Sequence, residues 1–187
     1  MTELRDPAIL DPGFRADVER LLDVLGAQPG YEFRISATLR TPWQQARLWR
    51  QSRTRATISE RVVALRRAGA EYLAHVLESV GPQSGRPVTN AIPGLSWHQW
   101  GEAADFYLVE SGVAVWDAAH PGYHALAITA ESLGLKSGRG FGDPPHVQAR
   151  HTEPTALPIL EVDAEMRERF GLSERDWLQK NAREWRA

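Results

Sequence analysis

The sequence predicts an α+β fold in which a small antiparallel sheet is flanked by helices. Apolar residues recur at helical spacing over residues 14–25 and again over 58–80. Residues 103–108 instead alternate as a half-buried strand does. Strands separated by helices on one side favour this fold class, with an open sheet face that is free to carry a site. A chain of 187 residues can bury a good core, and we expect one domain over residues 1–187.

The first elements have clear start and stop signals. A helix is predicted after Asp11-Pro12, and Gly26 ends it. A strand over residues 31–40 follows, with its odd-numbered apolar residues on one face and Arg40 on the other. Thr41-Pro42-Trp43-Gln44 is typical of a capping box with proline at the first helical position, and predicts a helix through about Arg50.

The middle of the chain predicts one long amphipathic helix and then the rest of the sheet. Thr57-Ile58-Ser59-Glu60 repeats the capping pattern, and Gly81-Pro82 stops the helix. Further strands are expected near Val88 and over residues 103–108, 113–116 and 146–149, with a helix over 123–133 between the last two. A capped helix from Ser173 is expected in a C-terminal extension over about residues 160–187.

Composition and charge exclude several classes of protein. The formal net charge of −2 gives no electrostatic reason to expect a nucleic acid partner. The chain has no cysteine, which excludes disulfides and thiol catalysis. No run is long enough to span a membrane, and the N-terminus lacks a signal segment. We expect a monomer that is made in the cytoplasm without a signal peptide and leaves it by another route.

Two distant segments carry metal-binding residue types. His98 and Asp105 lie in Ser96-Trp97-His98-Gln99-Trp100-Gly101-Glu102-Ala103-Ala104-Asp105, and His146 ends Asp143-Pro144-Pro145-His146. Two imidazoles and one carboxylate make a three-ligand zinc site with an open fourth position, as catalytic zinc requires. Asp105 is expected on the strand face opposite Phe106. His146 and Gln148 are expected on one face of a short strand, so that the ligands meet in one cleft.

These segments resemble the zinc D-Ala-D-Ala carboxypeptidase and L-alanyl-D-glutamate endopeptidase superfamily, which includes phage endolysins and D-Ala-D-Ala dipeptidases. Ser96, His98, Gly101, Ala103 and Asp105 match its first motif, and Asp143 and His146 match its second. Ala37-Thr38-Leu39-Arg40-Thr41-Pro42-Trp43-Gln44-Gln45 resembles a third block, and residues 88–94 resemble the usual approach to the first histidine. The resemblance spans roughly residues 30–150. It implies a fold of the hedgehog and D,D-peptidase kind.

The resemblance also implies a role for each matching residue. His98, Asp105 and His146 would bind Zn²⁺, Asp143 would be the general base, and Arg40 would hold the substrate carbonyl or a carboxylate. Ser96 and Gln45 would lie near the substrate. The expected function is hydrolysis of peptidoglycan stem peptides, most specifically as an L-alanyl-D-glutamate endopeptidase. A D-alanyl-D-alanine carboxypeptidase or dipeptidase is the enzymatic alternative, and a non-catalytic zinc-bearing binding module is the alternative from another class.

Other candidate residues have plainer interpretations. His120 and His124 are spaced as a metal pair on a helix would be, but Pro121 and Gly122 favour a helix start between them. Trp97 and Trp100 fit either a wall of the site or the core. Gln148 fits either a hydrogen bond that orients a ligand or a polar strand end.

The sequence departs from the family pattern in two places. Residues 55–86 are longer than the short turn usual in endolysin-like members, and their helix is expected to be scaffold. Residues 137–142 lack the tryptophan that is common before the aspartate. The sequence therefore does not define which residues form the rim of the specificity pocket. The sequence leaves open the scissile bond, the cell-wall chemotype and a phage or cellular origin.

Overall fold

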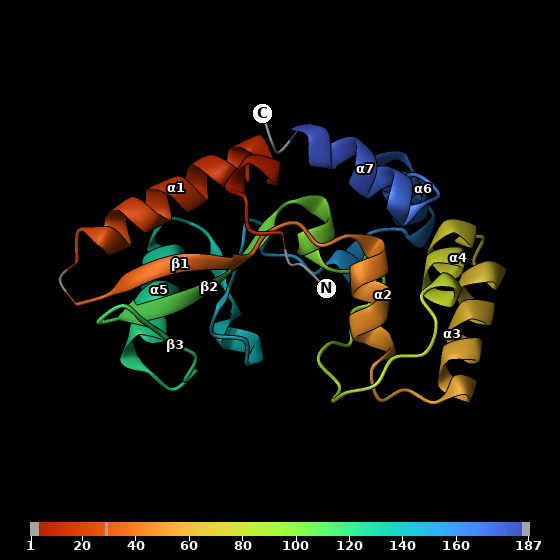
Figure 1. The fold of residues 1–187 in the computed structure, drawn as a ribbon, viewed down its shortest axis with the longest axis horizontal. Coiled ribbons are helices and arrows are strands. Elements are labelled where there is room, and N and C mark those ends of the chain that lie inside the picture. Colours follow the sequence, from red (N-terminus) through yellow and green to blue (C-terminus); the bar gives the residue numbers. More distant parts are fainter. Residues whose placement is uncertain (1–3, 29, 185–187) are drawn as a thin grey trace. The chain divides into compact units, whose positions relative to one another are not determined.

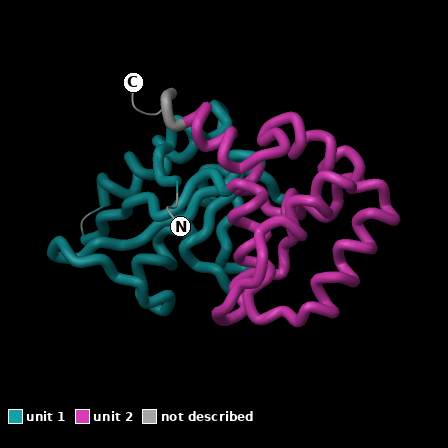
Figure 2. Tube along the Cα trace, turned by 45° about the vertical axis from the view of Figure 1, so that its right-hand side comes forward, with its two compact units in different colours: residues 1–40, 100–152 teal, residues 41–99, 153–187 magenta. Residues whose placement is uncertain are grey.

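A computed structural model describes residues 4–28 and 30–184 of the chain (Figure 1). The chain forms two compact units (Figure 2). The first unit comprises residues 1–40 and 100–152, and the second comprises residues 41–99 and 153–187. The expected single domain over 1–187 stays a prediction. None of the described helices has the length and apolar character that a membrane span needs.

The first unit contains an antiparallel sheet. Its strands are β1 (Glu32–Ala37), β2 (Ala103–Glu110), β3 (Val113–Val115), β4 (Lys136–Ser137) and β5 (His146–Gln148). The order is β1-β2-β5-β4, and β3 pairs with β2 beside the β5 pairing. Figure 1 shows α1 (Pro12–Gly26) and α5 (Pro121–Ser132) beside this sheet. The predicted α+β class with a small antiparallel sheet is confirmed.

One face of the sheet forms the core of this unit. Alternate β2 residues point into it, and Phe106 and Leu108 are fully buried there. Helix α1 contributes its predicted apolar stripe to the same core, and the Asp11 carboxylate caps its first turn. The aliphatic and aromatic residues of this core include Phe14, Val18, Leu21, Leu25, Phe33, Phe106, Leu108, Tyr123, Leu126 and Val147. The opposite face of β2 is therefore left for polar side chains.

The second unit is helical over its regular elements. It contains α2 (Pro42–Arg50), α3 (Arg55–Arg67), α4 (Glu71–Ser79), α6 (Ile159–Phe170) and α7 (Glu174–Glu184). The predicted capping box of α2 is present, since the Thr41 hydroxyl accepts from the Gln44 amide and the Gln44 side chain accepts from the Thr41 amide. Helix α7 is capped by Ser173, as expected, and its Trp177 ring packs against Phe170 of α6. Residues 185–187 of the predicted extension lie outside the described residues.

Two predictions in the middle of the chain were wrong. The expected single helix over residues 57–80 is two helices, and its cap is Thr54 instead of Thr57. The chain leaves the first helix at Ala68 and passes through Gly69, whose φ of 79° is left-handed, so the helix cannot continue. The strand expected near Val88 is irregular backbone, and the Val88 side chain is exposed.

Candidate metal centre

The central strand pairs Asp105 with His146. Asp105 lies between the buried residues Ala104 and Phe106 of β2, so its carboxylate points to the other face of the sheet. The register of β2 and β5 sets Asp105 directly opposite His146 and Ala104 opposite Val147. Residues directly opposite share a face, and both predicted ligands therefore lie on the polar face.

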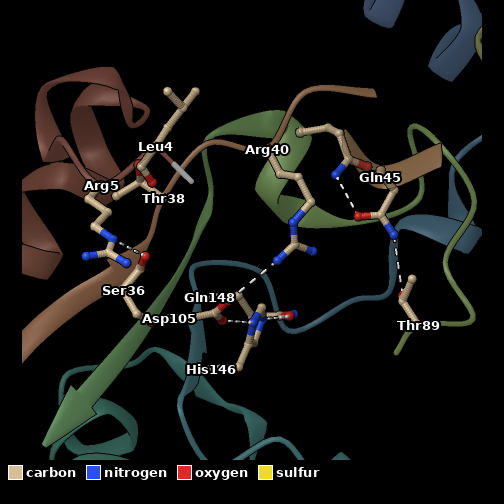
Figure 3. Close-up of polar contacts among 11 residues, drawn as sticks. Leu4, Arg5, Ser36, Thr38, Arg40, Gln45, Thr89, Asp105, His146 and Gln148 are labelled. Atoms are coloured by element: carbon tan, nitrogen blue, oxygen red, sulfur yellow. Dashed lines mark hydrogen bonds and ion pairs between the residues drawn. The ribbon is translucent and has the colours of Figure 1, made fainter. Parts of the chain in front are cut away.

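The orientation of the His146 ring is fixed by a chain of hydrogen bonds (Figure 3). The Gln148 amide nitrogen donates to the Arg150 carbonyl, which turns the Gln148 Oε1 atom toward His146. His146 Nε2 lies 3.0 Å from this oxygen and therefore donates to it. The remaining ring nitrogen, Nδ1, lies 3.0 Å from Asp105 Oδ1. Of the two interpretations of Gln148, the structure therefore shows the hydrogen bond to a candidate ligand.

Charge and burial act on His146 in opposite directions. Its side chain is buried, and burial by itself lowers the pKa of an imidazole. The hydrogen bond to Asp105 and the negative charges of Asp105 and Asp143 outweigh burial, so the pKa of His146 is raised above its usual value. The raised pKa means that this position attracts a positive charge, whether a proton or a metal ion.

His98 is carried by a short 3-10 helix, η2 (Trp97–Trp100), and its side chain is 2% exposed. The chain then turns through Gly101, whose φ is 73°. A Cβ atom there would lie 2.9 Å from the Asp11 backbone nitrogen, which already donates to the Gly101 carbonyl, so only glycine fits. This turn leads from His98 into β2.

The three predicted ligands come together. One candidate ligand atom each from His98, Asp105 and His146 lie within 4.8 Å of one another. Zinc bonds of 2.0–2.2 Å in tetrahedral geometry place ligand atoms about 3.3–3.5 Å apart, so the 3.0 Å contact of His146 with Asp105 is close to that spacing. His146 Nδ1 and the carboxylate oxygen are both acceptors in the tautomer that Gln148 selects, and a cation between them removes their repulsion. The residues therefore fit a zinc ion.

Arg40 lies beside the ligand carboxylate. Figure 3 shows its guanidinium pointing toward Asp105, and Nη2 is 3.6 Å from Asp105 Oδ2. About a fifth of each side chain is exposed. The simple alternation expected along residues 31–40 is wrong, because the register shifts between Ile35 and Ala37 and the strand ends at Ala37. The shift sets Ala37 opposite Asp105, and the segment that follows brings Arg40 to the ligand.

Asp143 occupies the turn before His146. Its carbonyl accepts from the His146 amide at 3.0 Å, its amide donates to the Gly138 carbonyl at 2.9 Å, and its residue is exposed. The turn lies so close to Gly138 that a Cβ atom there would be 2.0 Å from the Asp143 carbonyl oxygen and 2.7 Å from His146 Cβ. Gly138 therefore permits the position of both residues. The general-base role of Asp143 stays a prediction.

The structure also shows where Ser96, Gln45 and His120 lie. Ser96 is half-buried, and its carbonyl accepts from the Gln99 amide at the start of η2. Gln45 is fully buried in the second unit and bonds to Thr89, Ala91 and Gln99 through its amide group. The bond to Gln99 means that Gln45 helps to hold η2 in place. Contact with substrate stays a prediction for Ser96 and for Gln45. His120 caps α5 through its Nδ1 atom, as the helix-start interpretation expected.

Sequence reasoning missed two residues near His146. The Phe141 ring meets the His146 ring edge to face with centroids 5.5 Å apart, and Phe141 is half-exposed. Gly138, described above, was the second. Phe141 and Gly138 both lie in residues 137–142, where the sequence lacks the tryptophan common in the family it resembles. Their contacts with His146 become visible only in the structure, because this loop lies close to β5.

Comparisons with known proteins give a limited result. No protein-family model and no protein of curated function matches the chain. Among solved structures, the chain is similar to a mutant of the vancomycin resistance D,D-pentapeptidase VanY from the VanB-type resistance cassette, in complex with Zn(II). The TM-score is 0.44 at 17% identity, and the match covers 82% of this chain and 83% of that chain.

Proposed function

We propose that this protein is a zinc-dependent hydrolase of peptide bonds in peptidoglycan stem peptides. The observation that carries the proposal is the group of His98, Asp105 and His146, in which the hydrogen bond to Gln148 turns His146 Nδ1 toward Asp105. These three residues would hold the zinc ion. When bound, zinc would polarise the scissile carbonyl and lower the pKa of a water molecule toward neutrality.

The chain's own residues would supply the other parts of the reaction. Asp143, exposed beside His146, would accept the proton of the attacking water and return it to the leaving amine. Arg40 keeps its guanidinium near Asp105 Oδ2 at 3.6 Å, a separation too long for a good hydrogen bond. A guanidinium carries several N–H donors, and such a group suits the negative charge that develops on the substrate carbonyl oxygen.

Within this class we propose an L-alanyl-D-glutamate endopeptidase. The support is the sequence resemblance of Asp143-Pro144-Pro145-His146 and of residues 88–94 to endolysin endopeptidases. The metal ligands alone do not select the bond, since carboxypeptidases and dipeptidases of the superfamily share them. We further propose that the protein acts as a monomer on the cell wall.

Mass spectrometry of muropeptides tests both levels of the proposal. Purified protein loaded with Zn²⁺ is incubated with muropeptides that carry complete stem peptides, and the products are identified. New fragments that begin with D-Glu support the endopeptidase. Release of D-Ala alone would make the protein a carboxypeptidase, and intact stems in the presence of bound zinc would favour a binding module. A matched digest with the Asp143→Asn protein separates turnover by this site from contaminating hydrolases.

A further inference from the structure

The polar face of the sheet carries two adjacent rows of side chains. In the first row Asp105 of β2 lies between Ala37 of β1 and His146 of β5. In the second row Tyr107, two residues further along β2, lies opposite Arg34 of β1. Because side chains alternate along a strand, Tyr107 and Asp105 share a face and stand about 7 Å apart.

Trp116 completes the second row on the other side of Tyr107. The register pairs Leu108 with Val115, so the next residues in each direction, Tyr107 and Trp116, are opposite one another. Their rings are stacked, with centroids 5.1 Å apart and an interplanar angle of 17°. Trp116 nevertheless remains 62% exposed, which is unusual for so large an apolar side chain.

Polar groups border this aromatic surface. Arg34 forms an ion pair with Glu32 at 2.7 Å, and both side chains are more than half exposed. The exposed indole stacks on the Tyr107 ring, and the register places Arg34 on the other side of Tyr107. A row of two ring faces that ends at a guanidinium and a carboxylate suits a ligand with an apolar face and polar edges. A pyranose ring has this character, because its C–H groups can cover the indole while its hydroxyl and acetamido groups reach the charged side chains.

We propose that Arg34, Tyr107 and Trp116 bind the N-acetylated sugar to which the stem peptide is attached. The proposal rests on the proposed function and deepens it. In an L-alanyl-D-glutamate endopeptidase, one alanine and one lactyl group separate the scissile carbonyl from the sugar, about two residue lengths or roughly 7 Å. This length matches the spacing of the two rows. In a D,D-carboxypeptidase four residues and the lactyl group would separate the scissile carbonyl from the sugar, roughly 17 Å, and its sugar would not reach Trp116.

The first experiment measures sugar binding without catalysis. The disaccharide of N-acetylglucosamine and N-acetylmuramic acid, with no peptide, is titrated into the zinc-loaded full chain, and binding is followed by saturation-transfer NMR and tryptophan fluorescence. We expect saturable binding that weakens about tenfold or more in Trp116→Ala. Val113→Ala is the matched control, because Val113 is 66% exposed on the same hairpin but points to the other face. Trp116→Tyr should restore part of the affinity.

The second experiment measures how the sugar contributes to cleavage. For each protein, kcat/KM on a disaccharide-linked stem peptide is divided by kcat/KM on the free peptide. We expect the wild-type ratio to be well above one, and to fall about tenfold in Trp116→Ala. Equal disaccharide affinity in wild type and Trp116→Ala, or a ratio of one in the wild type, would overturn the sugar site. Sugar binding in a protein that cleaves no stem peptide would leave the sugar site standing and overturn the proposed function.

Discussion

His146 Nδ1 lies 3.0 Å from Asp105 Oδ1, and in the neutral ring the hydrogen bond of His146 Nε2 to Gln148 leaves both facing atoms as acceptors. Two acceptors at this separation repel each other unless a proton or a metal ion lies between them. The arrangement therefore connects the metal affinity of the site to a glutamine that is not itself a ligand.

Removing this glutamine should weaken metal binding. In Gln148→Leu the buried Nε2 of His146 loses its acceptor, so the ring is no longer held with Nδ1 toward Asp105. We expect zinc affinity to fall about 10–100-fold, as measured by competition with a chelating dye. The control is Gln28→Leu, which changes an exposed glutamine of the same unit. Unchanged affinity in Gln148→Leu would mean that Gln148 has no part in orienting the ligand.

The purified protein should contain about one zinc ion per chain. His98, Asp105 and His146 fill three positions and leave a fourth for water or substrate. Chelation should abolish hydrolysis and lower the melting temperature, and added Zn²⁺ should restore both. Elemental analysis and calorimetry on one preparation check this, and an active preparation without metal would contradict it.

Asp143→Asn should separate catalysis from metal binding. Asp143 is exposed in the turn and lies outside the group of three ligands, so the variant should keep its zinc and its fold. The rate of muropeptide hydrolysis should fall about 10²–10⁴-fold, because the amide cannot accept the proton. Asp23→Asn, an exposed aspartate on α1, is the control. Loss of zinc would make Asp143 a ligand, and full activity would remove it from the mechanism.

Arg40→Lys should lower activity without loss of structure. Lysine keeps the positive charge near Asp105 but lacks the planar fork that can hold Asp105 and a substrate oxygen together. We expect kcat to fall about 10²-fold with an unchanged melting temperature. Arg20→Lys on the exposed side of α1 provides the comparison. Wild-type turnover in Arg40→Lys would reduce this residue to a strand-end charge.

Gly138→Ala should displace the turn that carries Asp143 and His146. The new methyl group would overlap the Asp143 carbonyl oxygen, so the loop must shift away from β5, at a cost of about 1–3 kcal/mol in the free energy of unfolding. Zinc affinity should fall together with stability. Gly140→Ala is a close control, since a Cβ atom there meets no heavy atom within 4 Å. Equal melting temperatures and zinc affinities in the two variants would show that the turn adapts freely.

The sequence by itself determined the local elements and the identity of the candidate ligands. Caps and apolar stripes depend on neighbouring residues, so Asp11 and Thr41 correctly marked the starts of α1 and α2. Strict alternation along β2 correctly placed Asp105 and Phe106 on opposite faces. The spacing of His98, Asp105 and His146 depends on covalent order, and it indicated a group that the structure brings together.

Local pattern failed where backbone geometry changed within an element. The apolar periodicity continues through Gly69, but the left-handed conformation there divides the expected long helix into α3 and α4. The register shift after Ile35 ends the alternation that the sequence suggested for the strand before Arg40. The left-handed conformation of Gly69 and the register shift after Ile35 leave the order of apolar and polar residues unchanged. The hydrophobic periodicity of the sequence therefore could not reveal either of them.

Only the tertiary structure decided which side chains support the ligands. The contact of His146 with Asp105, the approach of Arg40 to Asp105 and the stacking of Tyr107 on Trp116 each depend on how strands pair. These contacts follow from register, and a shift of one residue would send each strand side chain to the opposite face. The sequence therefore named the residues that can bind a metal, while the paired strands decided how His146 is oriented and what surface lies beside it.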